Sequence, residues 1–269
     1  MADTIANILS IAGSDPSGGA GIQADLKTFA ARGTYGMAAL TALTAQNTQG
    51  VSGVHLVPPD FVAAQVAAVF ADIRVDAVKI GMIASAEIAE AVAAALSPHR
   101  AVPIVLDPVM VAKGGASLLA QEAVAALTRQ LLPRASVLTP NLPEAAALLR
   151  EAEAVDRAGM EDQARRLLDL GPKAVLLKGG HLPGSESPDV LATPDRLHWF
   201  EGVRVLTRNT HGTGCSLSSA IAAELGKGQA LADAVAAAKR FIAGAVRLSD
   251  ALTVGSGHGP LHHFHQSGN

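Results

Sequence analysis

The residues most able to do chemistry lie in one stretch, Asn209-Thr210-His211-Gly212-Thr213-Gly214-Cys215. Two glycines let the backbone turn sharply and bring its N–H groups close to a ligand. The apolar run from residue 216 onward predicts a buried helix, and N–H groups at a helix start lack intrahelical partners, so they form an anion site. Cys215, the only cysteine, lies at that start, where the helix dipole favours thiolate over thiol. The stretch indicates phosphate chemistry beside a base; a glycine-rich turn with a small buried cysteine is the structural alternative.

Other glycines and polar residues concentrate where predicted strands end. In open parallel sheets, ligands bind beyond the carboxyl ends of the strands, so the residues that follow each strand are candidates. They are residues 13–21, 46–47, 81–82, 107–109, 141 with 144, 178–180 and the stretch that ends at Cys215. Their concentration at these ends favours a functional role for the set.

Four of these candidates could serve a metal ion or a phosphate. Asp107 ends an apolar strand, where a carboxylate in a cleft suits Mg²⁺ or a phosphate-side role, although a turn before proline would also explain it. Asn141 and Glu144 have the spacing of a capping box at a helix start. Alternatively, both hold metal-bound waters, which Mg²⁺ usually keeps. Lys178 ends a buried strand before two glycines, and we interpret it as a cation that reaches a phosphate rather than a solvated strand end.

A second group of candidates suits a small ring-shaped ligand. The loop at residues 13–21 loosely fits the dinucleotide fingerprint, but no acidic residue follows Asp25 at the spacing that a ribose requires, so a nicotinamide role is not expected. We expect the loop to wall a small ligand and Asp25 to point into the pocket, unless Asp25 is a solvated first-turn carboxylate. Gln46 offers a donor and an acceptor to a heteroaromatic edge, and Met82 offers an apolar floor. A polar loop residue and a core filler are their structural alternatives.

The elements that must position these residues alternate between apolar strands and helical runs. Strands are predicted at residues 7–12, 38–43, 54–57, 77–80, 104–106, 136–139, 174–177 and 203–206. Helices are predicted at residues 22–31, 59–70, 85–96, 121–131, 160–170 and 230–248. Short alternating pieces within residues 189–208 indicate a small antiparallel edge. The alternation predicts βαβ units, so we expect an α/β fold with a mostly parallel central sheet, helices on both faces and a single domain over residues 1–269.

Composition limits the expected partners. The chain of 269 residues is 49% hydrophobic and has a formal net charge of -3 at pH 7. Without a basic excess, nucleic acid is not an expected partner. No run reaches the roughly 18 apolar residues of a membrane span, so no membrane contact is expected. The amino terminus lacks the basic region of a signal peptide, and one cysteine cannot form an intrachain disulfide. We therefore expect a soluble, cytoplasmic protein.

Three further chemistries lack their usual residues. The chain has no Gly-x-x-x-x-Gly-Lys-Ser/Thr motif of a P-loop kinase and no Gly-x-Ser-x-Gly elbow of a hydrolase. His262, His263 and His265 lack convincing metal-ligand spacing and have no accompanying cysteine or carboxylate cluster. We interpret this tail as a packed or frayed terminus.

The candidates belong to motifs that extend through nearly the whole chain. These are AGSDPSGGAGIQAD (12–25), TALTAQNT (41–48), VKIGM (78–82), LDPVM (106–110), TPNLPE (139–144), LKGGH (177–181), NTHGTGC (209–215) and GPLHHF (259–264). On these motifs the sequence closely resembles the hydroxymethylpyrimidine/phosphomethylpyrimidine kinases of thiamine biosynthesis, in the ribokinase-like superfamily. The resemblance implies a ribokinase-like three-layer α/β/α sandwich and a homodimer.

The resemblance also implies a transferase that uses ATP and Mg²⁺. It would phosphorylate the hydroxymethyl group of 4-amino-5-hydroxymethyl-2-methylpyrimidine and then add a second phosphoryl group to the monophosphate. The resemblance implies that Gln46 hydrogen-bonds the pyrimidine edge. It also implies that the pyrimidine pocket is lined by Gly13, Ala20, Asp25, Met82 and Val109. Gly212, Thr213, Gly214 and Cys215 would form a catalytic anion hole. Asp107, Asn141 and Glu144 would serve the phosphates and, through water, the metal, and Lys178 would lie on the nucleotide side.

Cys215 replaces the aspartate base that the superfamily's sugar kinases usually carry, a departure typical of the pyrimidine-kinase branch. We hypothesise that Cys215 takes the proton of the substrate hydroxyl, help that is worth roughly 10²–10⁴-fold in rate. A pyridoxal or pyridoxine kinase of the same superfamily is the first alternative. A catalytically silent pyrimidine-binding homologue is the second.

Overall fold

A computed structural model describes residues 4–110 and 121–266, and its centre is an eight-stranded sheet. From one edge to the other, the strands are β10 (Leu197–Phe200), β9 (Asp189–Ala192), β8 (Val175–Lys178), β7 (Val137–Leu138), β6 (Ile104–Leu106), β5 (Ala77–Ile80), β1 (Asn7–Ala12) and β2 (Tyr35–Leu40). The strands from β2 to β8 are parallel. At one edge β9 pairs antiparallel with β8, and β10 with β9, which confirms the predicted antiparallel edge.

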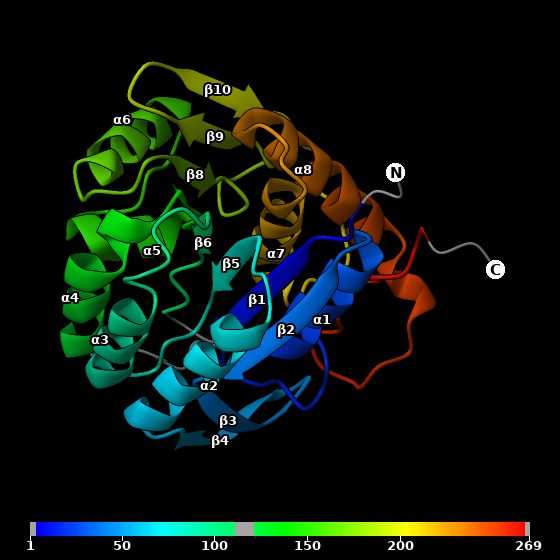
Figure 1. The fold of residues 1–269 in the computed structure, drawn as a ribbon. Coiled ribbons are helices and arrows are strands. Elements are labelled where there is room, and N and C mark those ends of the chain that lie inside the picture. The colour runs from blue at the N-terminus through cyan, green and yellow to red at the C-terminus, as the bar shows by residue number, and fades with distance from the viewer. Residues whose placement is uncertain (1–3, 111–120, 267–269) are drawn as a thin grey trace.

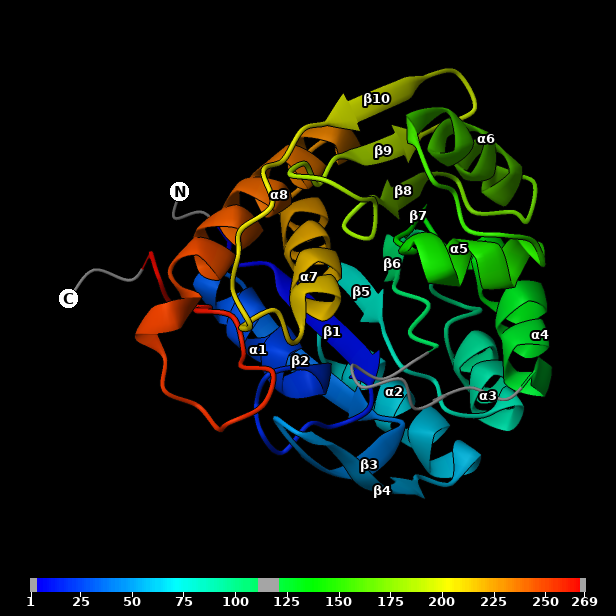
Figure 2. The ribbon, with the colours of Figure 1, turned by 180° about the vertical axis from the view of Figure 1, so that it is seen from behind.

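Helices cover both faces of this sheet (Figure 1). One face carries α2 (Pro59–Asp72), α3 (Ala86–Ala95), α4 (Gln121–Gln130), α5 (Leu142–Leu149) and α6 (Arg157–Leu168). The other face, on the left of the sheet in Figure 2, carries α1 (Gly21–Ala31), α7 (Thr213–Gly226) and α8 (Leu231–Arg247). Two short 3-10 turns are η1 (Leu132–Arg134) and η2 (Ser249–Ala251). The predicted α/β/α sandwich is confirmed.

Apolar residues on both sides of each strand hold the three layers together. In β1, Ile8 packs into the layer of α1, α7 and α8, whereas the next residue, Leu9, packs into the opposite layer. In β6, Val105 and Leu106 divide in the same way. Successive side chains of a strand point to opposite faces, so a sheet covered on both sides needs continuous apolar runs. The short apolar segments of the sequence have this pattern for that reason.

The region after β2 differs from the sequence-based expectation. The predicted strand at residues 38–43 is divided between two strands, because β2 ends at Leu40 and β3 begins at Ala42. The chain leaves the main sheet at Thr41, whose hydroxyl donates a hydrogen bond to the Met82 carbonyl oxygen at 2.6 Å. Strands β3 (Ala42–Asn47) and β4 (Gly50–Leu56) then form a separate antiparallel hairpin, beside β2 in Figure 1. The hairpin register shifts between Ala45 and Gln46, as at a β-bulge, which re-aims side chains.

The predicted strand at residues 203–206 is wrong. Val203 makes only an isolated bridge to Glu186, and Val203 and Leu206 are 83% and 92% exposed. Their alternation with charged and polar neighbours imitates a strand, but no partner strand lies alongside them in the described part of the chain. The segment is an extended connection between the antiparallel edge and the turn before α7.

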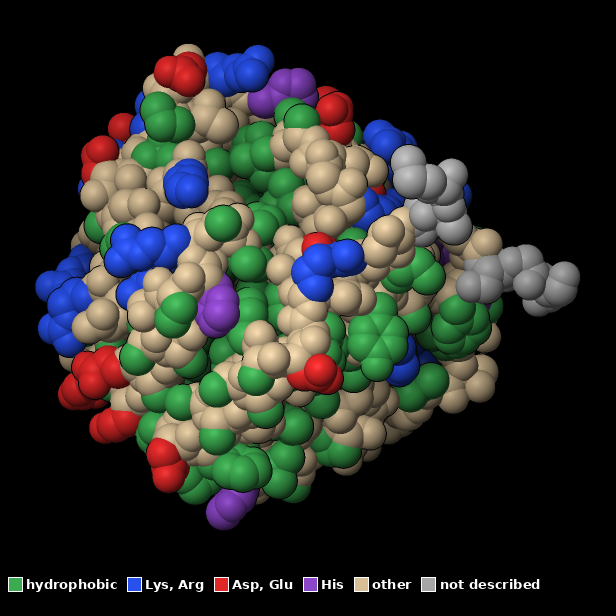
Figure 3. Space-filling view, viewed as in Figure 1, with side chains coloured by type: hydrophobic (Ala, Val, Ile, Leu, Met, Phe, Trp, Pro, Cys, Tyr) green, Lys and Arg blue, Asp and Glu red, His purple; other side chains and the backbone are tan. Residues whose placement is uncertain are grey.

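The surface agrees with the near-neutral charge balance. Lysine and arginine side chains and acidic side chains are interspersed on the face in Figure 3. Hydrophobic side chains gather over the lower part of that view, where the hairpin and α2 lie, and Leu43, Val54 and Leu56 of the hairpin are exposed. Among the described residues, none of the helices has both the length and the apolar character needed to cross a bilayer.

Candidate active site

The predicted site residues meet around one cavity of about 1050 Å³. It lies beyond the carboxyl ends of β1, β5, β6 and β8, where the sheet order places β2 and β5 on opposite sides of β1. Such a change in strand order is where open α/β sheets bind ligands. Of the predicted residues, those that line the cavity are Gly13, Ala20, Gln46, Met82, Asp107, Val109, Asn141, Glu144, Lys178, Gly212, Thr213, Gly214 and Cys215.

The turn before α7 is shaped by Gly212. Its φ of 79° lies in the left-handed region, and a side chain there would collide with the carbonyl oxygen of Gly19 in the N-terminal loop. The first i→i−4 hydrogen bond of α7 runs from the Ser216 N–H to the Gly212 carbonyl oxygen at 2.8 Å. The N–H groups of Gly214 and Cys215 precede it in the first turn, where helix N–H groups have no partner within the helix. Amides at such a helix start attract an anion. The predicted glycine turn at the start of α7 is therefore present and lines the cavity, and its binding of an anion stays a prediction; residues 212–215 are called the anion loop below.

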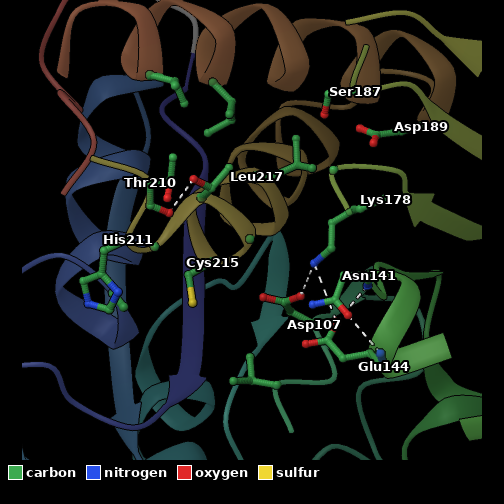
Figure 4. Close-up of a pocket in the computed structure, with 18 of the residues that line it drawn as sticks. Asp107, Asn141, Glu144, Lys178, Ser187, Asp189, Thr210, His211, Cys215 and Leu217 are labelled. Carbon is green, nitrogen blue, oxygen red and sulfur yellow. Dashed lines mark hydrogen bonds and ion pairs between the residues drawn. The ribbon is translucent and has the colours of Figure 1, made fainter. Parts of the chain in front are cut away.

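The anion loop lies against a pair of opposite charges. A Cβ on Gly214 would lie 3.2 Å from Lys178 Nζ and 3.7 Å from Asp107 Oδ2, so the missing side chain lets these groups approach the helix start. Lys178 Nζ donates to Asp107 Oδ1 at 2.9 Å and lies 3.9 Å from Glu144 Oε2. Figure 4 shows Lys178 reaching down from the end of β8 to these carboxylates. Lys178 is thus no solvated strand end, because its ammonium group belongs to a buried charge cluster.

Asn141 and Glu144 form the capping box that their spacing predicts. The Glu144 N–H donates to Asn141 Oδ1 at 2.9 Å, and the Asn141 N–H donates to Glu144 Oε2 at 2.8 Å. The pKa of Glu144 is raised to about 7, mainly by burial. The charge of Asp107 also raises it, whereas Lys178 and the hydrogen bonds with Asn141 lower it. The same carboxyl group therefore caps α5 and changes its charge near neutral pH.

Asp107, Asn141 and Glu144 offer a donor set that fits Mg²⁺. Carboxylate and amide oxygens are hard ligands, and Mg²⁺ keeps several waters when few side chains bind it. Asp107 Oδ1 accepts hydrogen bonds from Lys178 and Thr139, whereas Oδ2, on the side of the anion loop, receives a long 3.4 Å bond from the Ser218 hydroxyl. The set could hold a hydrated ion between the anion loop and α5.

Cys215 differs from the expectation that the helix dipole favours its thiolate. The pKa of Cys215 is raised to about 11, mainly by burial. The charges of Asp107 and Asp25 also raise it, whereas Lys79 lowers it. A helix start and a nearby cation lower a thiol pKa, whereas burial and neighbouring carboxylates raise it. Here two carboxylates and burial outweigh the dipole. The raised pKa does not support a polarised thiolate, and the catalytic role of Cys215 stays a prediction.

The ring-side residues occupy the opposite end of the cavity from the charge cluster. A side chain at Gly13 would collide with the Met82 methyl group, so glycine lets Met82 pack against the N-terminal loop. Gln46 reaches the cavity from β3 and contacts Thr44 and His211. These residues form a mostly neutral wall that suits an uncharged heteroaromatic ring.

Asp25 does not point into the cavity as expected. It is fully buried, accepts hydrogen bonds from Ser10 and Ser219, and pairs with Lys79, whose Nζ lies 2.9 Å from Asp25 Oδ2. It is not a solvated first-turn carboxylate either. Lys79 itself lines the cavity, so Asp25 lies behind the wall. Burial disfavours the charge of Lys79, but Asp25 outweighs it and raises the lysine pKa.

Sequence reasoning gave no role to Asp15 and His211, which join the two loops of the site. His211 Nε2 lies 2.8 Å from Asp15 Oδ2, and both residues line the cavity. Both residues lie in candidate stretches, but they are 196 positions apart in the sequence, and no sequence periodicity indicates a contact over such a separation. At the carboxyl terminus, His263 is buried and lies 2.8 Å from the Ser216 hydroxyl, which confirms the packed alternative for that residue.

Comparisons with known proteins agree with this geometry. The model of a family described as phosphomethylpyrimidine kinase matches residues 15–262. The hydroxymethylpyrimidine/phosphomethylpyrimidine kinase of Escherichia coli (strain K12) is 53% identical over 259 residues, 96% of this chain and 97% of that protein. A crystal structure of phosphomethylpyrimidine kinase from Clostridium difficile 630 has a TM-score of 0.79 and 43% identity, covering 89% of this chain and 98% of the other. An ADP complex of Bacillus subtilis pyridoxal kinase has a TM-score of 0.89 and 36% identity, covering 98% and 99%.

Proposed function

The chain belongs to the phosphomethylpyrimidine kinase family, and we propose that it transfers phosphoryl groups from ATP to a pyrimidine in this cavity. The acceptors are the hydroxymethyl group of 4-amino-5-hydroxymethyl-2-methylpyrimidine and then the monophosphate, a step of thiamine biosynthesis. The observation that supports this most is the meeting of an anion-binding helix start with a buried lysine and a neutral wall in one cavity.

The charged end of the cavity is proposed to hold the transferring group. Phosphoryl transfer depends mainly on positioning and on stabilising charge over the phosphoryl oxygens. The ammonium group of Lys178 lies beside Gly214 in the first turn of α7, so the lysine and the amides at this helix start would both supply positive charge to a phosphoryl group there. Mg²⁺, when bound by Asp107, Glu144 and Asn141 through water, would add charge neutralisation. Nucleotide phosphates would therefore lie between Lys178 and the anion loop.

The neutral end of the cavity is proposed to hold the ring. Gln46 bonds the ring edge, and Gly13, Ala20, Met82 and Val109 pack around the ring. Asp25 supports this wall through Lys79 rather than by touching the ligand. The hydroxymethyl group then points toward Cys215, between the ring and the anion loop.

Cys215 is proposed to accept the hydroxyl proton late in the transfer. Only the thiolate can accept this proton, and because the pKa of Cys215 is raised to about 11, the thiolate is a small fraction that forms when the thiol first loses its own proton to solvent. The transition state is loose, so the alcohol becomes acidic only as its oxygen bonds to phosphorus. In the second step the acceptor is a phosphate oxygen that is already ionised, and no proton must be removed.

The assembly and the compartment are further proposals. We propose a homodimer, because Leu43, Val54 and Leu56 expose apolar surface on one hairpin. We also propose a cytoplasmic location, which agrees with the single cysteine and a kinase that uses ATP.

Mass analysis of products tests the proposed function directly. The protein is incubated with ATP, Mg²⁺ and the aminopyrimidine alcohol, and we expect products that have gained one and then two phosphoryl groups. Pyridoxine is assayed in parallel. Phosphorylation of pyridoxine without any product from the aminopyrimidine would overturn the proposal.

A further inference from the structure

The ring wall contains a chain of hydrogen bonds that begins at a buried carboxylate. Asp15 is 1% exposed, and its oxygens accept bonds from the Ser17 N–H and hydroxyl and from the Ala20 N–H. Burial raises the pKa of Asp15, but the bonds from His211 and Ser17 outweigh it and lower the pKa to about 2. Asp15 is therefore a fixed, ionised acceptor at the base of the wall.

This acceptor determines which nitrogen of His211 carries a proton. His211 Nε2 lies 2.8 Å from Asp15 Oδ2. An ionised carboxylate can only accept, so a stable contact at this distance requires a proton on Nε2. Protonated Nε2 has no lone pair to offer, so the other group within its reach can only accept a share of the same N–H.

That other group is the amide of Gln46. The same Nε2 atom of His211 lies 3.3 Å from Gln46 Nε2, while Gln46 Oε1 lies 3.3 Å from the Thr44 hydroxyl. A half-turn of the amide exchanges its oxygen and nitrogen without moving the rest of the side chain, and hydrogen-bond partners decide between the two orientations. Two donors would face one another with the amide nitrogen toward His211, so the partners favour the orientation with Oε1 toward the ring.

The opposite end of the amide agrees with this orientation. The Thr44 hydroxyl donates to the Ser14 carbonyl oxygen at 2.9 Å, which leaves a lone pair of the Thr44 oxygen for the Gln46 NH₂ group. Each group in the chain then has a complementary partner, from Asp15 through His211 and Gln46 to Thr44 and Ser14. The bulge at Ala45/Gln46 fixes where this amide enters the cavity.

We propose that Asp15, His211 and Thr44 lock the Gln46 amide in one orientation, and that this lock makes the site select a 4-aminopyrimidine over its 4-oxo counterpart. His211 is a positioning residue, because it acts through Gln46. The proposal rests on the proposed function, since it concerns how that site reads its substrate. After the internal bonds are made, Gln46 has one oxygen lone pair and one N–H left for the ligand.

The remaining pair matches only one of the two ring types. A 4-aminopyrimidine offers a donor at its amino group and an acceptor at N3, which complement Oε1 and the N–H of Gln46. The 4-oxo ring offers an acceptor at O4 and a donor at N3–H, the reverse pattern. A free amide would turn over and accept both rings, whereas a locked amide rejects the oxo ring because polar groups are left unpaired.

The test compares kcat/KM for 4-amino-5-hydroxymethyl-2-methylpyrimidine with that for 5-hydroxymethyl-2-methyl-4-oxopyrimidine. We expect the unmodified protein to prefer the amino ring by about 10²-fold or more. His211→Phe keeps an aromatic ring but loses the donor, so the preference should fall by about tenfold or more, mainly through KM. His211→Gln restores an N–H at a similar distance and should restore the preference. Circular dichroism and ATP affinity report whether each variant is folded.

A second pair of variants tests the other end of the lock. Thr44→Val removes the hydroxyl and should also lower the preference, whereas Thr44→Ser keeps the hydroxyl and should not. If His211→Phe does not fold, this pair decides the question. Equal losses for both rings in every variant, or no preference in the unmodified protein, would overturn the lock while leaving the kinase activity established. Absence of phosphorylation of either ring would instead overturn the proposed function and the lock with it.

Discussion

The two ends of the cavity are built in different ways. The charged end consists of Asp107 and Lys178, which end parallel strands, and Glu144, which caps α5. The ring end depends on Gln46 in a hairpin outside the main sheet and on His211 in a turn. The charged end is therefore held by the sheet itself, and the neutral end by hydrogen bonds between peripheral loops. We infer that phosphoryl transfer and ring recognition can be disturbed separately.

Loss of Lys178 should give the largest effect. Lys178→Met removes the ammonium group beside the anion loop and leaves Asp107 and Glu144 without their partner, so we expect kcat/KM to fall by about 10³-fold. Binding of the pyrimidine in the absence of nucleotide, measured by calorimetry, should stay within about twofold because the ring end is untouched. Lys173→Met is the matched control, because Lys173 is an exposed lysine that lies just before the start of the same strand, at the end away from the cavity. An equal loss of pyrimidine binding would show that the two ends are not separate.

Cys215 lies between the two ends and should affect one reaction more than the other. For Cys215→Ala we expect kcat with the alcohol to fall by about 10²-fold, since a proton acceptor is lost. With the monophosphate the decrease should be much smaller, because its acceptor oxygen carries no proton at neutral pH. Separate assays of the two steps check this. Near-normal turnover of the alcohol would contradict the role of Cys215.

The pH profile of the alcohol step gives an independent check on the thiol. Because the pKa of Cys215 is raised to about 11, the thiolate fraction grows throughout the range from pH 7 to pH 9. A rate that needs this thiolate should rise with pH over that range, and Cys215→Ala should flatten the rise. If the variant has the same pH profile as the unmodified protein, a group other than the Cys215 thiol causes the pH dependence.

Replacement of Gln46 should affect only the ring end. Gln46→Ala removes both bonds to the pyrimidine edge, and we expect pyrimidine affinity to fall by about thirtyfold, or about 2 kcal/mol. ATP affinity should remain unchanged, since Gln46 contacts His211, which Figure 4 shows on the other side of the cavity from Lys178. Parallel titrations with each ligand give the answer. Equal losses for both ligands would exclude this role.

The smallest expected effect is the response of the charged end to pH. Glu144 has a pKa raised to about 7, so it is mostly ionised at pH 8 and mostly protonated at pH 6. Only the ionised form attracts Mg²⁺, and its fraction falls by about tenfold over this interval, so apparent Mg²⁺ affinity should fall to a similar extent. Glu144→Gln should bind Mg²⁺ weakly at both values. An unchanged pH dependence in that variant would assign the titration to another group.

Local signals in the sequence predicted the charged end better than the ring end. The strands Ala77–Ile80 and Ile104–Leu106 were predicted with the bounds that the structure has, because continuous apolar runs identify central parallel strands. The capping box at Asn141 is likewise a local pattern with a defined spacing. Residues that end or cap such elements follow from them directly.

The ring end depends on interactions that sequence periodicity does not report. The predicted direction of Asp25 was wrong because Asp25 lies in α1 and its partner, Lys79, lies in β5, so the burial of both could not be deduced from the helix alone. The raised pKa of the thiol could not be predicted because burial and two carboxylates outweigh the local helix start. The contact of His211 with Asp15 joins residues that only the closed fold brings together.

The hairpin of β3 and β4 has a consequence for how such a protein can diversify. It carries Gln46 yet contributes no strand to the main sheet, so mutations within it would leave the layers and the transfer machinery in place. A lineage could therefore acquire a new acceptor alcohol by exchanging a few hairpin residues, without first passing through a poorly folded ancestor.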